Sequence, residues 1–122
     1  MKKITLCFII VLLVFITGCS SALSKNAGTY QLDYYKFVGD SENEKNTENK
    51  WELVLKSDGT GESFRNGTSY VVEWSMNNDE INIIEQYGIA IDYKGTIKNN
   101  ILSIYNGDKN NSLTVEYVFK KK

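Results

Sequence analysis

Two pairs of carboxylates are the side chains of this sequence best suited to acid–base chemistry. Asp58 and Glu62 flank one expected hairpin turn, and Asp79-Glu80 lies in another. Paired carboxylates can act as general acid and general base. However, Asp is favoured at turns for conformational reasons alone. The chain has no histidine, which excludes Ser-His-Asp and Cys-His catalysis as well as His-ligated zinc. We therefore expect no catalytic residue and no enzymatic activity.

A third acidic group lies in a long polar stretch, where Glu42, Glu44 and Glu48 could bind a hard cation weakly. Lys45 and Lys50 are interleaved with these acids, and the spacing is not that of a calcium loop. A solvated loop is the better interpretation. The two cysteines of the chain do not form a cluster for a metal either. We expect no metal site and no cofactor.

One cysteine follows a segment with the composition of an export signal. Met1-Lys2-Lys3 is positively charged, Ile4 to Ile16 is apolar apart from Thr5, and Thr17-Gly18-Cys19 comes next. At ~1.5 Å per residue such a helix spans about 20 Å, which is short of the ~30 Å hydrocarbon core of a membrane. Neither a plain transmembrane anchor nor an ordinary secretory signal explains a lone Cys at this position.

Ile16-Thr17-Gly18-Cys19 resembles the lipobox of bacterial lipoproteins. The resemblance implies that Cys19 receives a diacylglycerol group and that cleavage occurs before it, so that palmitate-type chains anchor the protein to the extracytoplasmic face of the cell membrane. Residues 1–18 are then a signal peptide, residues 19–27 the lipidated Cys and a tether without pattern, and residues 28–122 the folded domain. Residues 19–122 contain 12 basic and 15 acidic side chains. This net negative charge argues against a nucleic-acid partner, and we expect a monomer.

Beyond Gly28 apolar residues recur with a period of two, which is typical of β-strands with one buried face. Asp58-Gly59 and Asn66-Gly67 are hairpin signals between such segments. The eight expected strands are centred on Tyr30–Phe37, Trp51–Leu55, Phe64, Tyr70–Trp74, Ile81–Ile83, Ile89–Ile97, Ile101–Tyr105 and Leu113–Phe119.

Short connections make consecutive strands neighbours, which predicts an antiparallel meander. Closing the meander removes its two exposed edges, whereas a two-sheet sandwich needs longer crossing connections. We therefore predict an all-β fold, a small eight-stranded antiparallel up-and-down barrel behind an N-terminal helical signal peptide. Gly95 could mark a bulge or bend.

Gly28-Thr29-Tyr30, the segment Trp51–Gly61, Tyr93–Asn100 and the closing Tyr117–Lys121 resemble the small lipocalin-like domains of bacterial lipoproteins. The resemblance implies a barrel whose first inter-strand loop lies over its mouth and whose larger relatives carry small apolar ligands. Gly39–Lys50 is the longest connection and occupies the place of that loop.

The interior of an eight-stranded barrel is barely wide enough for side chains to fill. A filled core is therefore the better interpretation of the aromatic residues, and any cleft should be shallow and at one end. The polar loop must cross the end at which Tyr35, Phe37 and Trp51 lie, so these three are the candidate ligand-binding residues. The inward-facing aromatic set is expected to be Tyr30, Trp51, Phe64, Tyr70, Trp74, Tyr93, Tyr117 and Phe119.

Two functions remain open. The first is a non-enzymatic binding module for a small amphipathic molecule or a peptide at one barrel end. The alternative is a protein-interaction module, such as an inhibitor or accessory subunit of an envelope protein, with a filled barrel core. A cavity lined by apolar groups and one or two polar atoms favours the first. A packed interior with an exposed aromatic patch favours the second.

Overall fold

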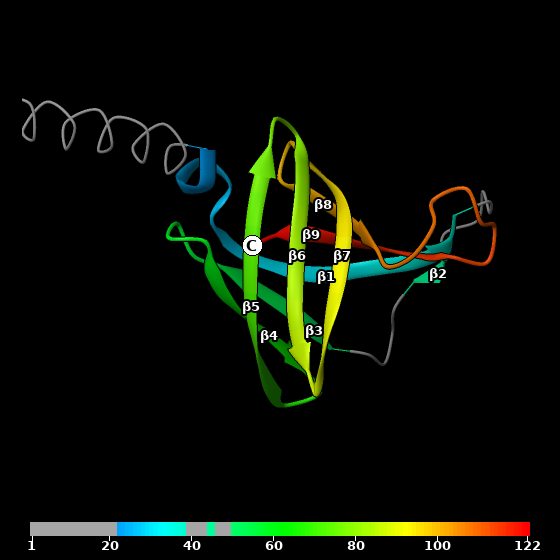
Figure 1. Cartoon of the computed structure of the whole chain (residues 1–122), viewed down its shortest axis with the longest axis horizontal. Coiled ribbons are helices and arrows are strands. Elements are labelled where there is room, and N and C mark those ends of the chain that lie inside the picture. The colour runs from blue at the N-terminus through cyan, green and yellow to red at the C-terminus, as the bar shows by residue number, and fades with distance from the viewer. Residues whose placement is uncertain (1–21, 39–43, 46–49) are drawn as a thin grey trace, which may run out of the picture.

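The computed structural model describes residues 22–38, 44–45 and 50–122, and almost all of this chain is antiparallel β-structure (Figure 1). Residues 22–26 form a single helical turn, and in the described ranges no helix is long and apolar enough to cross a membrane. The strands are β1 (Gly28–Phe37), β2 (Glu44–Lys45), β3 (Trp51–Leu55), β4 (Thr60–Arg65), β5 (Thr68–Asn77), β6 (Glu80–Tyr87), β7 (Ile89–Lys98), β8 (Ile101–Tyr105) and β9 (Val115–Lys121).

The long strands pair with their neighbours in chain order, from β1 and β3 through to β8 and β9, and every pairing is antiparallel. A further pairing of β1 with β9 closes the sheet. The two-residue strand β2 adds to β1 beside Tyr34 and Tyr35. The predicted all-β, eight-stranded, up-and-down barrel is therefore confirmed. The predicted signal peptide, residues 1–18, lies outside the described residues.

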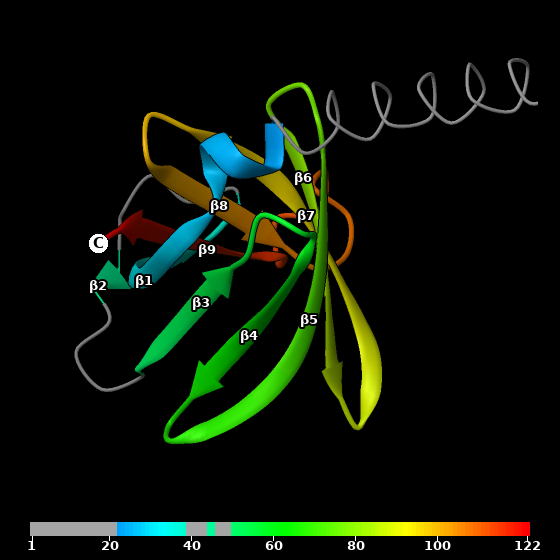
Figure 2. The same cartoon turned by 90° about the vertical axis from the view of Figure 1, so that its left-hand side faces the viewer.

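Strand β1 divides its length between two partners, and this division opens one end of the barrel. Gly28–Gln31 pairs with β3, while Tyr30–Phe37 pairs with β9 across a register shift between Leu32 and Tyr34. Strand β3 is only five residues long, so it has no partner for the second half of β1. A bulge bends its strand and increases the local twist. The second half of β1 consequently leaves β3 at the end where Trp51 begins β3 (Figure 2).

Two-residue hairpin turns form where the sequence predicted turns. Asn66 and Gly67 both have positive φ, at 50° and 86°, as a two-residue type I′ turn requires. Asn99 and Asn100 repeat this arrangement between β7 and β8, with φ of 54° and 65°. Asn tolerates the left-handed region because its short polar side chain bonds locally.

The core fills the barrel, as expected. Five of the eight predicted inward aromatics are buried, namely Tyr30, Trp51, Trp74, Tyr93 and Phe119. They pack with the aliphatic side chains Leu32, Leu53, Leu55, Val72, Ile81, Ile83, Ile97, Leu102 and Ile104. Tyr70 and Tyr117 are half-buried at one barrel end.

The inward placement of Phe64 was wrong. In β4 the buried positions are Gly61 and Ser63, so Phe64 lies on the outer face, where it pairs with Glu52 and Ser69. Volume explains the choice, because the indole of Trp51 fills the space inside β4 and donates a hydrogen bond of 2.8 Å to Ser63 Oγ. A small polar residue fits beside that ring, whereas a second large ring would overfill the site.

The helical turn at residues 22–26 closes the end of the barrel opposite to Trp51 (Figure 2). Leu23 packs against the core, and Tyr30 Oη donates a 2.6 Å hydrogen bond to the carbonyl of Asn26. Burial raises the pKa of Tyr30 to about 12, so this donor stays protonated even in alkaline solution where an exposed tyrosine would ionise. The tether was expected to lack pattern from Ser20 to Ala27. Instead, the part that the structure describes is folded onto the barrel.

Candidate functional site: the barrel mouth

The open end of the barrel contains a pocket of about 520 Å³, which we call the barrel mouth. Its lining comes from strands β1, β3, β4, β5, β6 and β9 and from the residues next to them. The lining residues are Leu32, Tyr35, Lys50, Trp51, Arg65, Asn66, Thr68, Tyr70, Tyr87, Val115 and Tyr117. The pocket lies at one end, above a filled core, as a shallow terminal cleft was expected to do.

The structure brings together two of the three predicted ligand-binding residues. Tyr35 and Trp51 both line the barrel mouth. Phe37 does not line it and lies at the end of β1 with 42% of its surface exposed. Of the predicted covering loop, Lys50 lines the pocket, whereas residues 39–43 and 46–49 lie outside the described residues.

Arg65 forms the floor of the barrel mouth, and it was not among the ligand-binding residues predicted from the sequence. Its Nη2 donates to Glu85 Oε1 at 2.8 Å and to Tyr93 Oη at 2.6 Å, and its guanidinium carbon lies 3.7 Å from the centre of a Trp51 ring. The register of β4 carries the signal, because Gly61, Ser63 and Arg65 share one face. Because Phe64 was predicted to point inward, the opposite face of β4, which carries Arg65, was predicted to point outward.

The ion pair beneath the mouth is unequally exposed. The side chain of Arg65 is 27% exposed, whereas that of Glu85 is 0% exposed. Arg65 Nε and Glu85 Oε2 are buried and have no hydrogen-bond partner within the described part of the chain. A buried carboxylate depends on its counter-ion. A molecule entering the mouth therefore meets the guanidinium and the nearby Lys50, while the compensating carboxylate stays hidden.

Tyr93 completes this group as a neutral phenol. Burial raises its pKa, and the positive charge of Arg65 opposes that shift only in part. The Tyr93 hydroxyl therefore accepts the hydrogen bond from Arg65 without carrying a charge.

Aromatic rings form the walls above Arg65. The ring centroids of Trp51 and Tyr117 lie 5.0 Å apart in an edge-on arrangement, and those of Tyr70 and Tyr87 lie 4.5 Å apart. The ring centroids of Tyr35 and Tyr117 lie 6.4 Å apart. Tyrosine and tryptophan offer a large apolar face together with a polar handle. The walls thus suit a ligand with a flat apolar part.

Two exposed apolar residues also lie at this end of the barrel. Ile89 at the start of β7 is 73% exposed, and Leu113 is 75% exposed. Leu113 was expected within the last strand, but it lies in the loop before β9, which begins at Val115. A second hollow, of about 440 Å³, adjoins the mouth and shares Val115 and Tyr117 with it.

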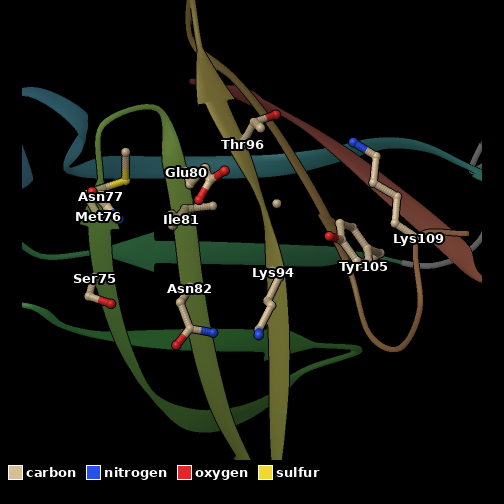
Figure 3. A pocket seen from close by; sticks show the side chains of 11 residues that line it. Ser75, Met76, Asn77, Glu80, Ile81, Asn82, Lys94, Thr96, Tyr105 and Lys109 are labelled. Carbon is tan, nitrogen blue, oxygen red and sulfur yellow. The ribbon is translucent and has the colours of Figure 1, made fainter.

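A different groove, of about 390 Å³, lies over the outer faces of β5 to β8 (Figure 3). Asn82, Lys94 and Tyr105 project into it from β6, β7 and β8. Tyr105 is the aromatic residue in its lining, so the groove lacks the aromatic clustering of the barrel mouth. We regard the mouth as the better candidate for a ligand site.

Asp58 stabilises its own turn, whereas Glu62 pairs with a neighbouring lysine. Asp58 accepts hydrogen bonds from Thr60 N at 2.9 Å and Thr60 Oγ1 at 2.6 Å, and these bonds lower its pKa. Glu62 lies 3.6 Å from Lys56. Over residues 22–38, 44–45 and 50–122, no three Cys, Asp or Glu side chains gather where they could hold a metal ion.

Comparisons with protein families, with curated proteins and with solved structures found no match to this chain. The functional proposal therefore depends on the chemistry of the barrel mouth and on the motif at Cys19.

Proposed function

We propose that the protein is a membrane-anchored extracytoplasmic lipoprotein whose barrel mouth binds a small amphipathic molecule or a peptide without catalysing a reaction. One observation carries the binding proposal: an aromatic-walled pocket opens at one barrel end, with the cation of Arg65 on its floor.

The lining supports a particular kind of ligand. The volume of the barrel mouth, about 520 Å³, lies within the ~300–1,000 Å³ typical of small-molecule sites. The charged lining residues are Lys50 and Arg65, both positive. We infer that the ligand pairs an apolar, preferably aromatic, part with an anionic group. An acidic peptide with one aromatic side chain has this chemistry too.

Binding without catalysis agrees with the state of the polar groups in the mouth. Arg65 is held by Glu85 and Tyr93, and Tyr93, whose pKa is raised by burial, is a protonated phenol that cannot act as a base at neutral pH.

The alternative is a protein-interaction module, an inhibitor or accessory subunit of an envelope protein. Ile89 and Leu113 favour it, because they expose apolar surface beyond the pocket itself. One experiment distinguishes the two functions. Replacing both residues by Ser should abolish capture of a protein partner, while leaving the affinity for a small amphipathic molecule unchanged.

The two tryptophans of the chain can report where an amphipathic molecule binds. Trp51 lines the mouth, whereas Trp74 donates to the carbonyl of Lys56 in the β3–β4 turn, near the closed end. We expect dodecanoate to change the fluorescence of a Trp74→Phe variant, in which Trp51 alone emits, but not that of Trp51→Phe. Dodecyltrimethylammonium, with an equally long chain, should bind about fivefold more weakly, a difference of about 1 kcal/mol.

Paired variants control this titration. Tyr87→Ser removes an aromatic wall and should weaken dodecanoate binding about tenfold. Tyr105→Ser, at the outer groove, should leave the affinity unchanged. Equal affinities for the two detergents, or equal effects of the two Tyr variants, would contradict an anion-selective mouth.

The anchor has its own test. Cys19→Ala should abolish labelling by radioactive palmitate and leave uncleaved precursor or released protein, because the acyl-accepting sulfur is gone. Cys7→Ala is the matched control and should be labelled and processed normally. Acylation of the Cys19→Ala protein would show that Cys19 is not the attachment site.

A further inference from the structure

The two ends of the barrel differ in both chemistry and position. The helical turn at residues 22–26 covers one end, together with the β3–β4, β5–β6 and β7–β8 turns. The mouth lies at the other end, beside the β4–β5 and β6–β7 turns. Figure 2 shows the turn at residues 22–26 and the β4–β5 hairpin on opposite sides of the molecule.

The helical turn is fastened to the closed end by several contacts. Leu23 packs against the core and lies beside Gly59 and Trp74. The carbonyl of Asn26 accepts the 2.6 Å hydrogen bond from Tyr30, and Ala27 N donates to the carbonyl of Leu23 at 2.8 Å. The chain is therefore already folded onto the barrel at residues 22–26, ahead of the first strand.

This early start leaves a very short link to the lipid-bearing residue. Only Ser20 and Ser21 separate Cys19 from Ala22. Three residue steps span at most ~11 Å. A link of this length keeps Ala22, and with it the closed end, close to the membrane surface, and it is too short to reach around the barrel to the opposite end.

The exposed charges of the closed end nearly cancel. Lys25 of the helical turn, Lys98 at the end of β7 and Lys121 at the end of β9 form no salt bridge within the described ranges. Asp58 of the β3–β4 turn, together with Asp79 and Glu80 of the β5–β6 turn, balances these three charges. The orientation of the barrel therefore depends on the short link to Cys19 and not on the charge of this end.

We propose that the closed end faces the membrane that holds the lipid anchor, and that the barrel mouth opens away from it. The mouth then collects its ligand from the aqueous side, as a dissolved amphipathic molecule or a peptide, and not from the anchoring bilayer. This inference rests on the proposed acylation of Cys19.

Two isosteric variants place a label at each end of the full-length protein. Ser57→Cys lies in the β3–β4 turn at the closed end, and Ser112→Cys lies in the loop before β9 at the mouth end. Cys7 leaves with the signal peptide and Cys19 is blocked by its acyl group, so a maleimide fluorophore reacts at the new Cys alone. Each labelled lipoprotein is reconstituted in phosphatidylglycerol vesicles that carry a nitroxide on the lipid headgroup.

We expect the label at position 57 to be quenched at least about threefold more than the label at position 112, since nitroxide quenching is short-ranged and an eight-stranded barrel separates the two ends. Inserting twelve Gly/Ser residues between Ser21 and Ala22 is the control. It should bring the two quenching values close together, because a long linker lets the domain rotate freely.

Equal quenching at the two positions, or stronger quenching at position 112, would overturn the orientation. Mass spectrometry of each sample beforehand separates this failure from that of the anchor. Protein without acyl chains would overturn both the anchor and the orientation, whereas acylated protein with the wrong quenching order overturns the orientation alone.

Discussion

Arg65→Met should lower the free energy of unfolding by about 3 kcal/mol, because removing one partner of a buried pair leaves an uncompensated charge. The remaining charge would be that of Glu85, whose side chain is 0% exposed and already has one oxygen without a partner. The variant also loses the stacking of the guanidinium on Trp51. Urea unfolding followed by far-ultraviolet circular dichroism measures the change.

Replacing the other partner of the ion pair, Glu85, should lower the free energy of unfolding by less. Glu85→Gln keeps the shape of the buried side chain and leaves Arg65, which is 27% exposed, able to turn its charge toward water. We expect a loss of about 1 kcal/mol. The double variant Arg65→Met/Glu85→Leu should return to within about 1 kcal/mol of the natural protein, because an apolar pair often replaces a buried ion pair without loss.

The double variant also separates stability from binding. It should fold normally, yet bind dodecanoate and dodecyltrimethylammonium with similar affinity, because the cation on the floor of the mouth is gone. A double variant less stable than Arg65→Met alone would contradict this account of the pair. If the double variant still preferred dodecanoate, Lys50 and not Arg65 would be the source of the anion selectivity.

Gly95→Ala should destabilise the barrel by about 3 kcal/mol through overpacking. A Cβ at this position would lie 2.8 Å from the carbonyl carbon and 2.9 Å from the Cα of the facing residues Ser103 and Ile104 in β8, and closer still to the Ser103 oxygen. These are backbone atoms of the neighbouring strand, so β7 and β8 must separate to make room. The expected loss in Tm exceeds about 10 °C for a domain of this size.

Gly67→Ala is the matched control. It has no atom within 4 Å of an added Cβ, but its φ is 86°. Its cost should be about 1 kcal/mol, which reflects only the left-handed backbone. Differential scanning calorimetry distinguishes the two effects. Equal losses at the two positions would show that β7 and β8 give way easily at Gly95.

Local pattern was sufficient for the barrel. The period-two alternation beyond Gly28, together with Asn66-Gly67 and the other turns, predicted eight strands joined in chain order, and the pairing of β1 with β9 closes them. Closing the sheet pairs the hydrogen-bonding groups at its two edge strands. Together with the alternating apolar pattern and the short connections, this leaves few other topologies. The same reasoning placed Tyr35 and Trp51 at one end.

The tertiary structure alone decided which face of β4 is inside and which end of the barrel is open. Alternation in β4 offers either Phe64 or the set Gly61, Ser63 and Arg65 to the interior, and local hydrophobicity favours Phe64. The choice goes the other way because Trp51 occupies the volume facing β4, bonds to Ser63 and stacks on Arg65. That volume is set by residues from strands distant in the sequence, and so is the partner Glu85, 20 positions further along the chain. The candidate site therefore depends on contacts between strands, which the alternation within a single strand does not specify.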